Sequence, residues 1–359
     1  MHLKKKILMR IKYPLILIFL LSFSSLFAQK DPQFSFFPWA LPIYNPGAMG
    51  EKEQHLNFTG IFRQGEMLIQ EKDNDNNTSN SQQQGTDPQN KETYRKVDQQ
   101  QIFLHIDSYI KQIKGAVGVM FLKDKNADIE MVGFKFGYAA KLPLRGGKLG
   151  IGVQFGFLNT KPPSTKYIFN DPGDDVLKGD KASTMDFDMN FGLHYRAPTW
   201  YVGLSCTQII GGVRVSGEKS SFKPVRNLYA VGGYIWNLKT PVPWSIEPSL
   251  LIQSEFATWS FALMALARYN GILWFGASYQ LTNGISALFG AVPFFNSANQ
   301  YLKGLEVGLG YTFQTKGFSY QQHGSWGDVE ILVRYGFNFY TEKGLTGYGS
   351  SRHLYKNQY

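Results

Sequence analysis

Apolar residues that recur at every second position are the feature that most constrains how this chain can fold. From residue 149 to residue 157, Leu, Ile, Val and Phe alternate with Gly and Gln. From 186 to 195, Phe, Met, Leu and Tyr alternate with Asp, Asn, Gly and His. Because successive side chains of a strand point to opposite faces, both segments are expected to be strands with one apolar and one small or polar face.

The same alternation continues through most of the chain and predicts about fourteen strands. The five clearest segments are 132–141, 149–157, 186–195, 305–313 and 329–339. Weaker segments complete the set at 55–64, 100–109, 115–122, 200–209, 226–236, 245–254, 258–268, 272–281 and 284–292. An even number of antiparallel strands with apolar outward faces is typical of outer-membrane proteins. The sequence therefore predicts an all-β fold, a transmembrane antiparallel β-barrel in a bacterial outer membrane.

The length of the apolar runs excludes helical membrane spans. The chain holds 28 Phe, 20 Tyr and 37 Gly, yet only 43% of its residues are hydrophobic. No apolar run after residue 28 is long enough for a helix to cross a bilayer. Since every backbone polar group needs an internal partner in hydrocarbon, a closed barrel is the remaining way to span a membrane.

The lengths of the connections predict how the barrel is oriented. The long connections are expected at 65–99, 159–184, 210–224 and 314–327, and the short ones at 110–114, 142–147, 195–199 and 269–271. Outer-membrane barrels have long extracellular loops and short periplasmic turns, so both chain termini are expected in the periplasm. The connections 255–257, 282–283 and 293–303 depart from this rule.

Both ends of the chain are expected to lie outside the barrel, which should span residues 51–340. Residues 1–28 combine Lys and Arg with a short apolar run that ends at Ala28, as in a cleaved secretory signal peptide. Residues 29–50 should form a periplasmic leader or plug segment, and residues 341–359 a C-terminal periplasmic tail. The signal peptide carries five positive charges and no negative ones, so its removal lowers the formal net charge from +10 to +5.

Nucleic acid is not an expected partner, because Lys and Arg are scattered through loops and turns instead of forming one basic face. The single cysteine, Cys206, allows no intramolecular disulfide. It is expected to be a small apolar residue of the barrel wall.

Two groups of titratable residues lie at predicted lumenal positions: His105 with Asp107, and Asp186 and Asp188 with His194. Polar residues are expected there because a barrel lumen is wet or internally paired. A catalytic site would also need a nucleophile beside a base, and no local motif indicates one. The chain is therefore not expected to be an enzyme, and a barrel hydrolase is the least favoured alternative.

No metal or cofactor is expected. Asp73 to Asn77 resemble the start of a calcium loop, but Thr78 and Gln84 stand where such a loop needs Gly and Glu. The acidic loop at 171–180 is expected to be a solvated surface loop.

Glycines at alternate positions superficially suggest a nucleotide-binding loop, as at Gly150 and Gly152 or at Gly308 and Gly310. They lie within predicted strands and no helix follows them, which such a loop requires. They are expected to be small lumenal positions.

The leader is rich in aromatic residues joined by Pro and Gly. The residues singled out for partner binding are Asp31, Pro32, Gln33, Phe34, Phe36, Phe37, Trp39, Tyr44, Asn45, Pro46 and Gly50. Exposed aromatic clusters often mark binding sites. Two interpretations stay open: an interfacial anchor or lumen plug, or a docking element for a periplasmic partner.

At these residues the sequence resembles the PorP/SprF family of type IX secretion system outer-membrane proteins. That family typically begins with a Gln/Asp-Pro-Gln-Phe-Ser stretch, then has an Asn-Pro turn that leads to Gly; residues 31–35 and 45–50 match both elements in order. Near the C-terminus, residues 326–330 precede the closing strand as the family pattern has it. The sequence departs from the pattern at Gly65, which follows Arg63 and Gln64 where an aromatic residue is expected.

The resemblance implies a role in protein export without catalysis. Family members work as outer-membrane components of the type IX secretion or gliding machinery, with periplasmic and peptidoglycan-associated components as partners. A secreted cargo protein or adhesin and the outer-membrane lipids are the other expected partners. The loops at 65–99 and 159–184 are expected to contact the cargo or the cell-surface complex. The alternative is a porin or substrate-specific outer-membrane channel, because such a protein shares every barrel feature described above.

Overall fold

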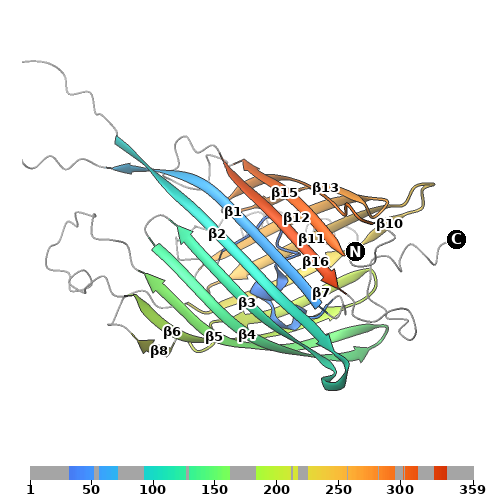
Figure 1. The fold of residues 1–359 in the computed structure, drawn as a ribbon, viewed down its shortest axis with the longest axis horizontal. Coiled ribbons are helices and arrows are strands. Elements are labelled where there is room, and N and C mark those ends of the chain that lie inside the picture. The colour runs from blue at the N-terminus through green and yellow to red at the C-terminus, as the bar shows by residue number, and fades with distance from the viewer. Residues whose placement is uncertain are drawn as a thin grey trace, which may run out of the picture.

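The computed structural model contains sixteen strands in one sheet (Figure 1). It describes residues 32–51, 56–71, 93–126, 129–161, 183–211, 213–216, 225–256, 258–281, 283–295, 302, 304–313 and 327–337. The first seven strands are β1 (Leu56–Glu71), β2 (Thr93–Ile110), β3 (Gly115–Asn126), β4 (Ile129–Leu144), β5 (Gly147–Lys161), β6 (Thr184–Arg196) and β7 (Trp200–Thr207). The others are β8 (Val213–Ser216), β9 (Asn227–Tyr234), β10 (Trp236–Leu238), β11 (Trp244–Ser254), β12 (Trp259–Tyr269), β13 (Leu273–Gln280), β14 (Gly284–Ala291), β15 (Leu305–Phe313) and β16 (Asp328–Phe337).

The sheet closes on itself through antiparallel pairs. β1 pairs with both β2 and β16, and β9 pairs with both β7 and β11. The short strands β8 and β10 only pair with β6 and β11 respectively. The remaining fourteen strands form a complete ring, which confirms the predicted antiparallel barrel and its strand count.

Most strand limits differ from the prediction by a few residues, and three differences are larger. β1 and β2 continue past the predicted ends at 64 and 100, and they pair as far as Glu71 with Thr93. These extensions do not alternate: β1 carries Met67, Leu68 and Ile69 in succession, and residues 93–101 of β2 are mostly polar. The predicted strand at 226–236 is divided at Ile235 into β9 and β10. The predicted loop at 210–224 contains β8.

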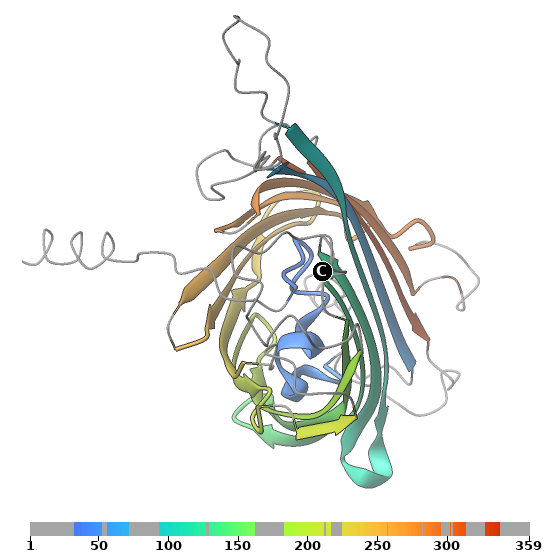
Figure 2. The ribbon, with the colours of Figure 1, turned by 90° about the vertical axis from the view of Figure 1, so that its left-hand side faces the viewer.

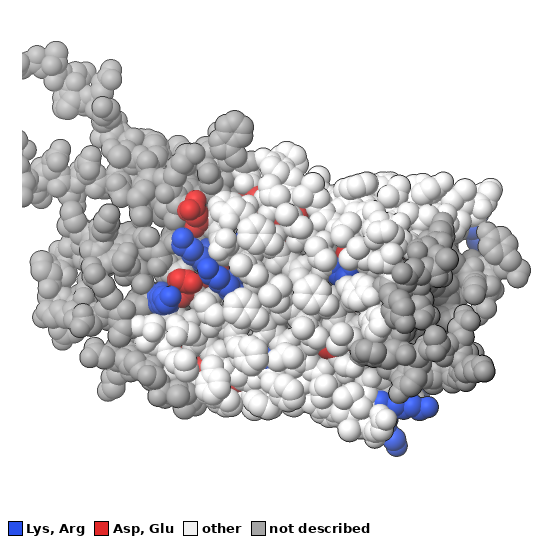
Figure 3. Space-filling model, viewed as in Figure 1, with Lys and Arg blue, Asp and Glu red and all other residues white. Residues whose placement is uncertain are grey.

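The two faces of the wall differ as the alternation predicts. Outward side chains of the central strands are apolar and exposed, as for Phe134 at 54% and Phe155 at 45% exposure. The intervening side chains point into the lumen, where Asp186, Asp188 and Asn190 are buried. Most of the barrel surface in Figure 3 carries uncharged side chains, and charged residues gather toward its two ends. The apolar outer belt is what a hydrocarbon environment requires.

Tight turns connect the strands at the end of the barrel where β1 begins, here called the turn end. Arg145 and Gly146 link β4 to β5 with φ values of 42° and 80°, and Asn270 and Gly271 link β12 to β13 with 49° and 66°. Two successive residues with positive φ match the right-handed twist of a hairpin. The opposite end, where β1 and β2 project beyond the wall, is called the loop end (Figure 1).

Within residues 32–51, the described part of the chain before the barrel, lie two short helical segments: α2 (Leu41–Tyr44) and the 3-10 turn η1 (Pro46–Ala48). A second 3-10 turn, η2 (Lys111–Ile113), joins β2 to β3. Among the described residues no helix has the length and apolarity to cross a membrane.

The outward position of Phe136, halfway along β4, generates a depth-dependent prediction. Phe136→Arg should lower the free energy of unfolding by about 2–4 kcal/mol, because the cation would lie near the bilayer midplane. Leu144→Arg, at the turn end of the same strand, should cost only about 0–1 kcal/mol. Reversible unfolding in urea with phospholipid vesicles measures both, and equal losses would contradict the predicted membrane position.

Candidate functional site

The leader lies inside the barrel. Residues 32–51 pass through the ring of strands, with α2 near its centre (Figure 2). Phe34, Phe36, Phe37, Tyr44 and Met49 have no exposed surface. The large apolar side chains of this segment are thus buried against the inner wall. The wall residues that face the lumen are mostly polar or small, as the alternation predicts.

Aromatic contacts hold the first half of the leader. The rings of Phe36 and Trp39 lie 5.9 and 5.1 Å from the ring of Trp274 on β13. Trp274 is fully buried, and a Cβ atom on Gly308 would come within 2.7 Å of its ring. Gly308 is therefore a small lumenal position, as predicted, and its role is to admit Trp274.

Glycines of the opposite wall make room for the Asn-Pro-Gly turn of the leader. A Cβ atom on Gly152 would overlap the backbone of Pro46 and Gly47, and one on Gly150 would overlap the Gly47 carbonyl. A larger residue would have to displace the turn, because buried atoms leave little free space. The alternating glycines of β5 thus form a cradle for the leader.

Asn45 fixes this turn by capping it and by joining it to the wall. Its Oδ1 accepts a hydrogen bond from the Gly47 N–H at 2.9 Å, and its Nδ2 donates to the Leu193 carbonyl at 2.9 Å. On the preceding residue, the carbonyl of Tyr44 accepts a 2.6 Å bond from Ser205. An asparagine is suited to this place because it supplies a donor and an acceptor from one side chain.

Charged side chains hold the end of the leader. The Gly50 N–H donates to Asp107 at 2.9 Å, and Asp107 also accepts from Asn57 at 2.8 Å. Lys141 donates to the Gly47 carbonyl at 2.9 Å. His105 lies 3.8 Å from Asp107, so this predicted pair supports the leader from the wall of the barrel.

Glu51 ends the leader with an ion pair to Arg196 at 2.9 Å and lies 3.6 Å from His194. Burial alone would raise the pKa of the Glu51 carboxyl, but Arg196, His194 and Lys141 outweigh burial and hold the pKa below its ordinary value. A carboxylate with a lowered pKa stabilises the fold at neutral pH, and this contribution is lost as the pH falls through the folded-state pKa.

A buried ion cluster at the strand seam that closes the barrel holds the start of the leader. Arg63 of β1 donates from Nε to Asp328 of β16 at 3.0 Å and from Nη1 to the Gln33 carbonyl at 2.9 Å. Glu330 accepts from the Ser35 N–H at 3.0 Å. The three charged side chains, here called the seam cluster, are at most 1% exposed. The start of the leader, Arg63 of β1 and residues 328–330 of β16 are far apart in the sequence and meet at this cluster.

Gly65 has a structural role in this cluster. A Cβ atom there would overlap the Asp328 carboxylate, which lies directly against the glycine. Gly65, which stands where the family pattern has an aromatic residue, thus leaves the space that the Asp328 carboxylate occupies beside Arg63.

The predicted site residues occupy the lumen, except Asp31, which lies outside the described residues. Buried there are Pro32, Gln33, Phe34, Phe36, Phe37, Tyr44, Asn45, Pro46 and Gly50. Only Pro38, Trp39 and Glu51 of the described leader are partly exposed. The contacts made by the buried residues are with the barrel wall, so the plug position is observed, while their partner-binding role stays a prediction.

The other predicted polar group, Asp186 and Asp188 with His194, is divided along β6: Asp188 contacts β4, whereas His194 lies beside Glu51 of the leader. Asp188 pairs with Lys135, whose Nζ also donates to Asn190 at 3.3 Å. No group of three or more His, Cys, Asp or Glu residues suited to a metal occurs among the described residues. The loops with Asp73 and Asp171 lie outside them.

A cavity of about 140 Å³ opens beside Trp39 toward the turn end and is here called the vestibule. Glu51, Asp107 and Glu247 line it together with Arg196, Arg268 and Arg334, so the two charge signs balance. Glu306 accepts from both Arg268 and Arg334 at 3.2 Å. The vestibule is therefore an internally paired polar chamber, in which Trp39 is the accessible aromatic residue of the leader.

Sequence reasoning missed Arg63, Lys141 and Trp274 as leader contacts and Asp328 as the partner of Arg63. All four occupy lumenal positions of their strands, and a large or charged residue at such a position was the available signal. Their partners could not be read from it, because the partners lie in distant parts of the chain.

The seam cluster generates a test of its importance for stability. Arg63→Gln should lower the free energy of unfolding by about 3–5 kcal/mol, because Asp328 and Glu330 would lose their buried cation. Lys123→Gln is the matched control, since Lys123 and Glu130 form a pair in which each side chain is 28% exposed. That pair should contribute at most about 1 kcal/mol. Urea unfolding in vesicles measures the difference, and equal effects would contradict the role of the cluster.

Comparison with solved structures finds outer-membrane barrels. The chain is similar to the TodX deltaS2S3 mutant monoaromatic hydrocarbon channel, with 11% identity over 84% of this chain and 94% of that one and a TM-score of 0.49. It is similar to the Ralstonia pickettii toluene transporter TbuX, with 13% identity over 83% and 94% and a TM-score of 0.44. It is also similar to a Pseudomonas aeruginosa FadL homologue, with 10% identity over 82% of this chain and 93% of that one and a TM-score of 0.43. These values carry no argument about function.

The sequence itself identifies the family. No curated protein matches the chain. The family model described as type IX secretion system membrane protein PorP/SprF matches residues 26–335, which include the leader and nearly all of the barrel. The family and fold are those of a secretion-system barrel protein and not of a known enzyme class. The chain therefore belongs to the PorP/SprF family of type IX secretion system membrane proteins.

Proposed function

We propose that this protein is a closed outer-membrane anchor of the type IX secretion machinery and not a conduit for solutes. The observation that carries this proposal is the burial of residues 32–51 in the lumen. A barrel of fourteen strands is wide enough for a channel unless something fills it. Here the leader fills it and is bound at its start, middle and end.

The contacts of the leader favour a permanent plug over a loosely held gate. Gln33 and Ser35 bind the seam cluster, Asn45 binds β6, and Gly50 binds Asp107 on β2. The first and last of these attachments are on the adjacent strands β16, β1 and β2, and the attachment of Asn45 is on β6. Release would leave Arg63, Asp107 and Glu330 with fewer partners in a buried setting, which is costly.

The two ends of the barrel suit different partners. We infer that the turn end faces the periplasm, because its connections are short. Periplasmic and peptidoglycan-associated components would then meet the rim of the vestibule, where Pro38 and Trp39 are the partly exposed leader residues. A secreted cargo protein or adhesin would meet the loop end, where β1 and β2 project and where the connections after Glu71 and Lys161 begin. The termini would both lie on the periplasmic side, with the described leader turned back into the lumen.

Conductance across planar bilayers tests whether the barrel is closed. The intact protein should give no single-channel steps, because its lumen is filled. A variant that lacks residues 32–50 should give them, since removal of the plug leaves a wide lumen. Removal of residues 341–359, a segment of the same length, is the matched control and should leave the barrel silent. Steps from the intact protein would instead favour the porin alternative.

Secretion by living cells tests the export role. Deletion of the gene should remove proteins from the culture supernatant and the cell surface, as measured by mass spectrometry, and the intact gene should restore them. Loss of many proteins would indicate a core role, and loss of one large adhesin a dedicated partner. An unchanged set of secreted proteins would refute the export role.

A disulfide can test whether the plug stays in place during secretion. The hydroxyl oxygens of Ser35 and Ser286 are 2.7 Å apart, so Ser35→Cys with Ser286→Cys should form a bond of about 2.05 Å. Cys206→Ala provides the background, and Ser35→Cys alone is the control. The locked protein should restore secretion fully. Loss of secretion that a reductant reverses would show that the leader must move.

A further inference from the structure

Backbone pairing is interrupted on one side of β11. The ladder between β9 and β11 stops at Gly233, and the ladder between β10 and β11 begins at Trp236. The residues between the two ladders, here called the ladder gap, are Tyr234, Ile235, Glu247 and Pro248. Pro248 has no N–H to donate, and proline is rare inside a strand that is paired on both sides. The ladder gap is therefore a local weakness of the wall.

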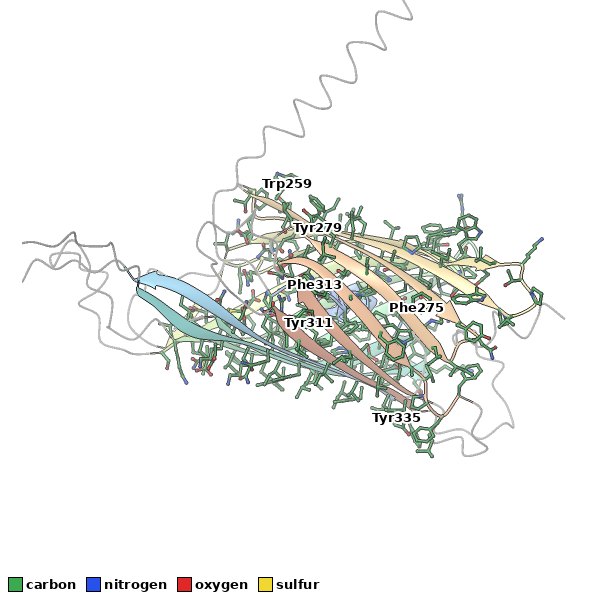
Figure 4. All side chains as sticks on the ribbon, turned by 90° about the horizontal axis from the view of Figure 1, so that it is seen from above. Trp259, Phe275, Tyr279, Tyr311, Phe313 and Tyr335 are labelled. Atoms are coloured by element: carbon green, nitrogen blue, oxygen red, sulfur yellow. The ribbon has the colours of Figure 1, made fainter. Side chains whose placement is uncertain are left out.

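On the outside of the wall, a cavity of about 620 Å³ lies against the ladder gap. Its floor is a row of small outward residues in register across three strands: Pro248 opposes Ala265, which opposes Ala277. The row above it consists of larger residues: Leu250, Leu263, Tyr279 and Ile285. Figure 4 marks Phe275 and Tyr279, the outward neighbours of Ala277 along β13. These two rows line an open depression, here called the outer groove.

The position of the outer groove determines what covers it. Leu250, Leu263 and Ile285 on its rim are 37%, 45% and 48% exposed, and they belong to the apolar belt that faces the bilayer. Its volume falls within the range of ligand sites, about 300–1,000 Å³. An empty apolar groove would lose dispersion contacts on every lining atom, which a flexible hydrocarbon chain restores. None of the described residues that line the groove is charged.

We propose that the outer groove binds one acyl chain of a phospholipid, with its inner end against the ladder gap. Tyr234 lines both the outer groove and the vestibule, and its neighbour Ile235 lines the vestibule. The bound chain thus lies beside the interruption in the pairing of β11 with β9 and β10. It covers the outer side of the wall next to the vestibule. This role is independent of the secretion function proposed above.

Lipid retention by the purified full-length protein tests the proposal. The protein is extracted in mild detergent, and bound lipid is counted by native mass spectrometry and identified after extraction. The intact protein should retain about one phospholipid per chain. Ala265→Phe should reduce retention about tenfold, a loss of about 1.4 kcal/mol in binding free energy, because the ring fills the floor of the groove.

Ala140→Phe is the matched control, because Ala140 also faces outward but lies on β4, away from the groove. It should retain lipid like the intact protein. Resistance of the folded barrel to unfolding in detergent, followed by its mobility in unheated gels, confirms that each variant is folded. Ala277→Phe provides a second filling variant if Ala265→Phe does not fold. Equal retention by the intact and filled proteins, equal loss in the control, or lipopolysaccharide as the retained lipid would each overturn the proposal.

Discussion

Closure of the sheet through β1 and β16 is the constraint on which the rest of the structure depends. In hydrocarbon an unpaired strand edge leaves backbone N–H and C=O groups without partners, so a membrane sheet must end where it began. Here the last strand pairs with the first over ten residue pairs. The same seam carries Arg63, Asp328 and Glu330, so the backbone closure is accompanied by a buried charge cluster.

The seam cluster connects closure of the barrel to placement of the leader. Arg63 and Glu330 lie 3.8 Å apart as an ion pair, and each also binds a backbone group of residues 33–35. Because one contact comes from β1 and the other from β16, both can form together only when the two strands are side by side. Closure of the wall and placement of the start of the leader therefore depend on the same cluster.

The lumen of this fourteen-stranded barrel is occupied by a segment of the same chain, residues 32–51. The wall contributes small residues where the leader backbone approaches, as at Gly150 and Gly152, and charged residues where the leader has free polar groups, as at Asp107 and Lys141. The leader contributes aromatic side chains, which provide apolar burial within an otherwise polar lumen. Shape and polarity thus match on both sides of the contact.

Much of the barrel could be predicted from the sequence, because alternation with a period of two is a local property of each strand. It placed the strands, their apolar outer faces and the lumenal positions of Asp188 and Gly152. It failed where the backbone pairing does not follow the local alternation of apolar and polar residues. The ends of β1 and β2 pair without alternation, and the ladder gap interrupts a strand that the pattern at 226–236 leaves continuous.

The sequence by itself determined that the chain forms an outer-membrane-type barrel and that its leader carries aromatic residues in an unusual number. Only the tertiary structure decided where those residues lie, that Arg63 meets Asp328 across 265 positions of sequence, and that the glycines form a cradle. The physical reason is that lumenal contacts depend on which strands face each other across the closed ring. A one-dimensional pattern shows which way a side chain points but not what it meets there.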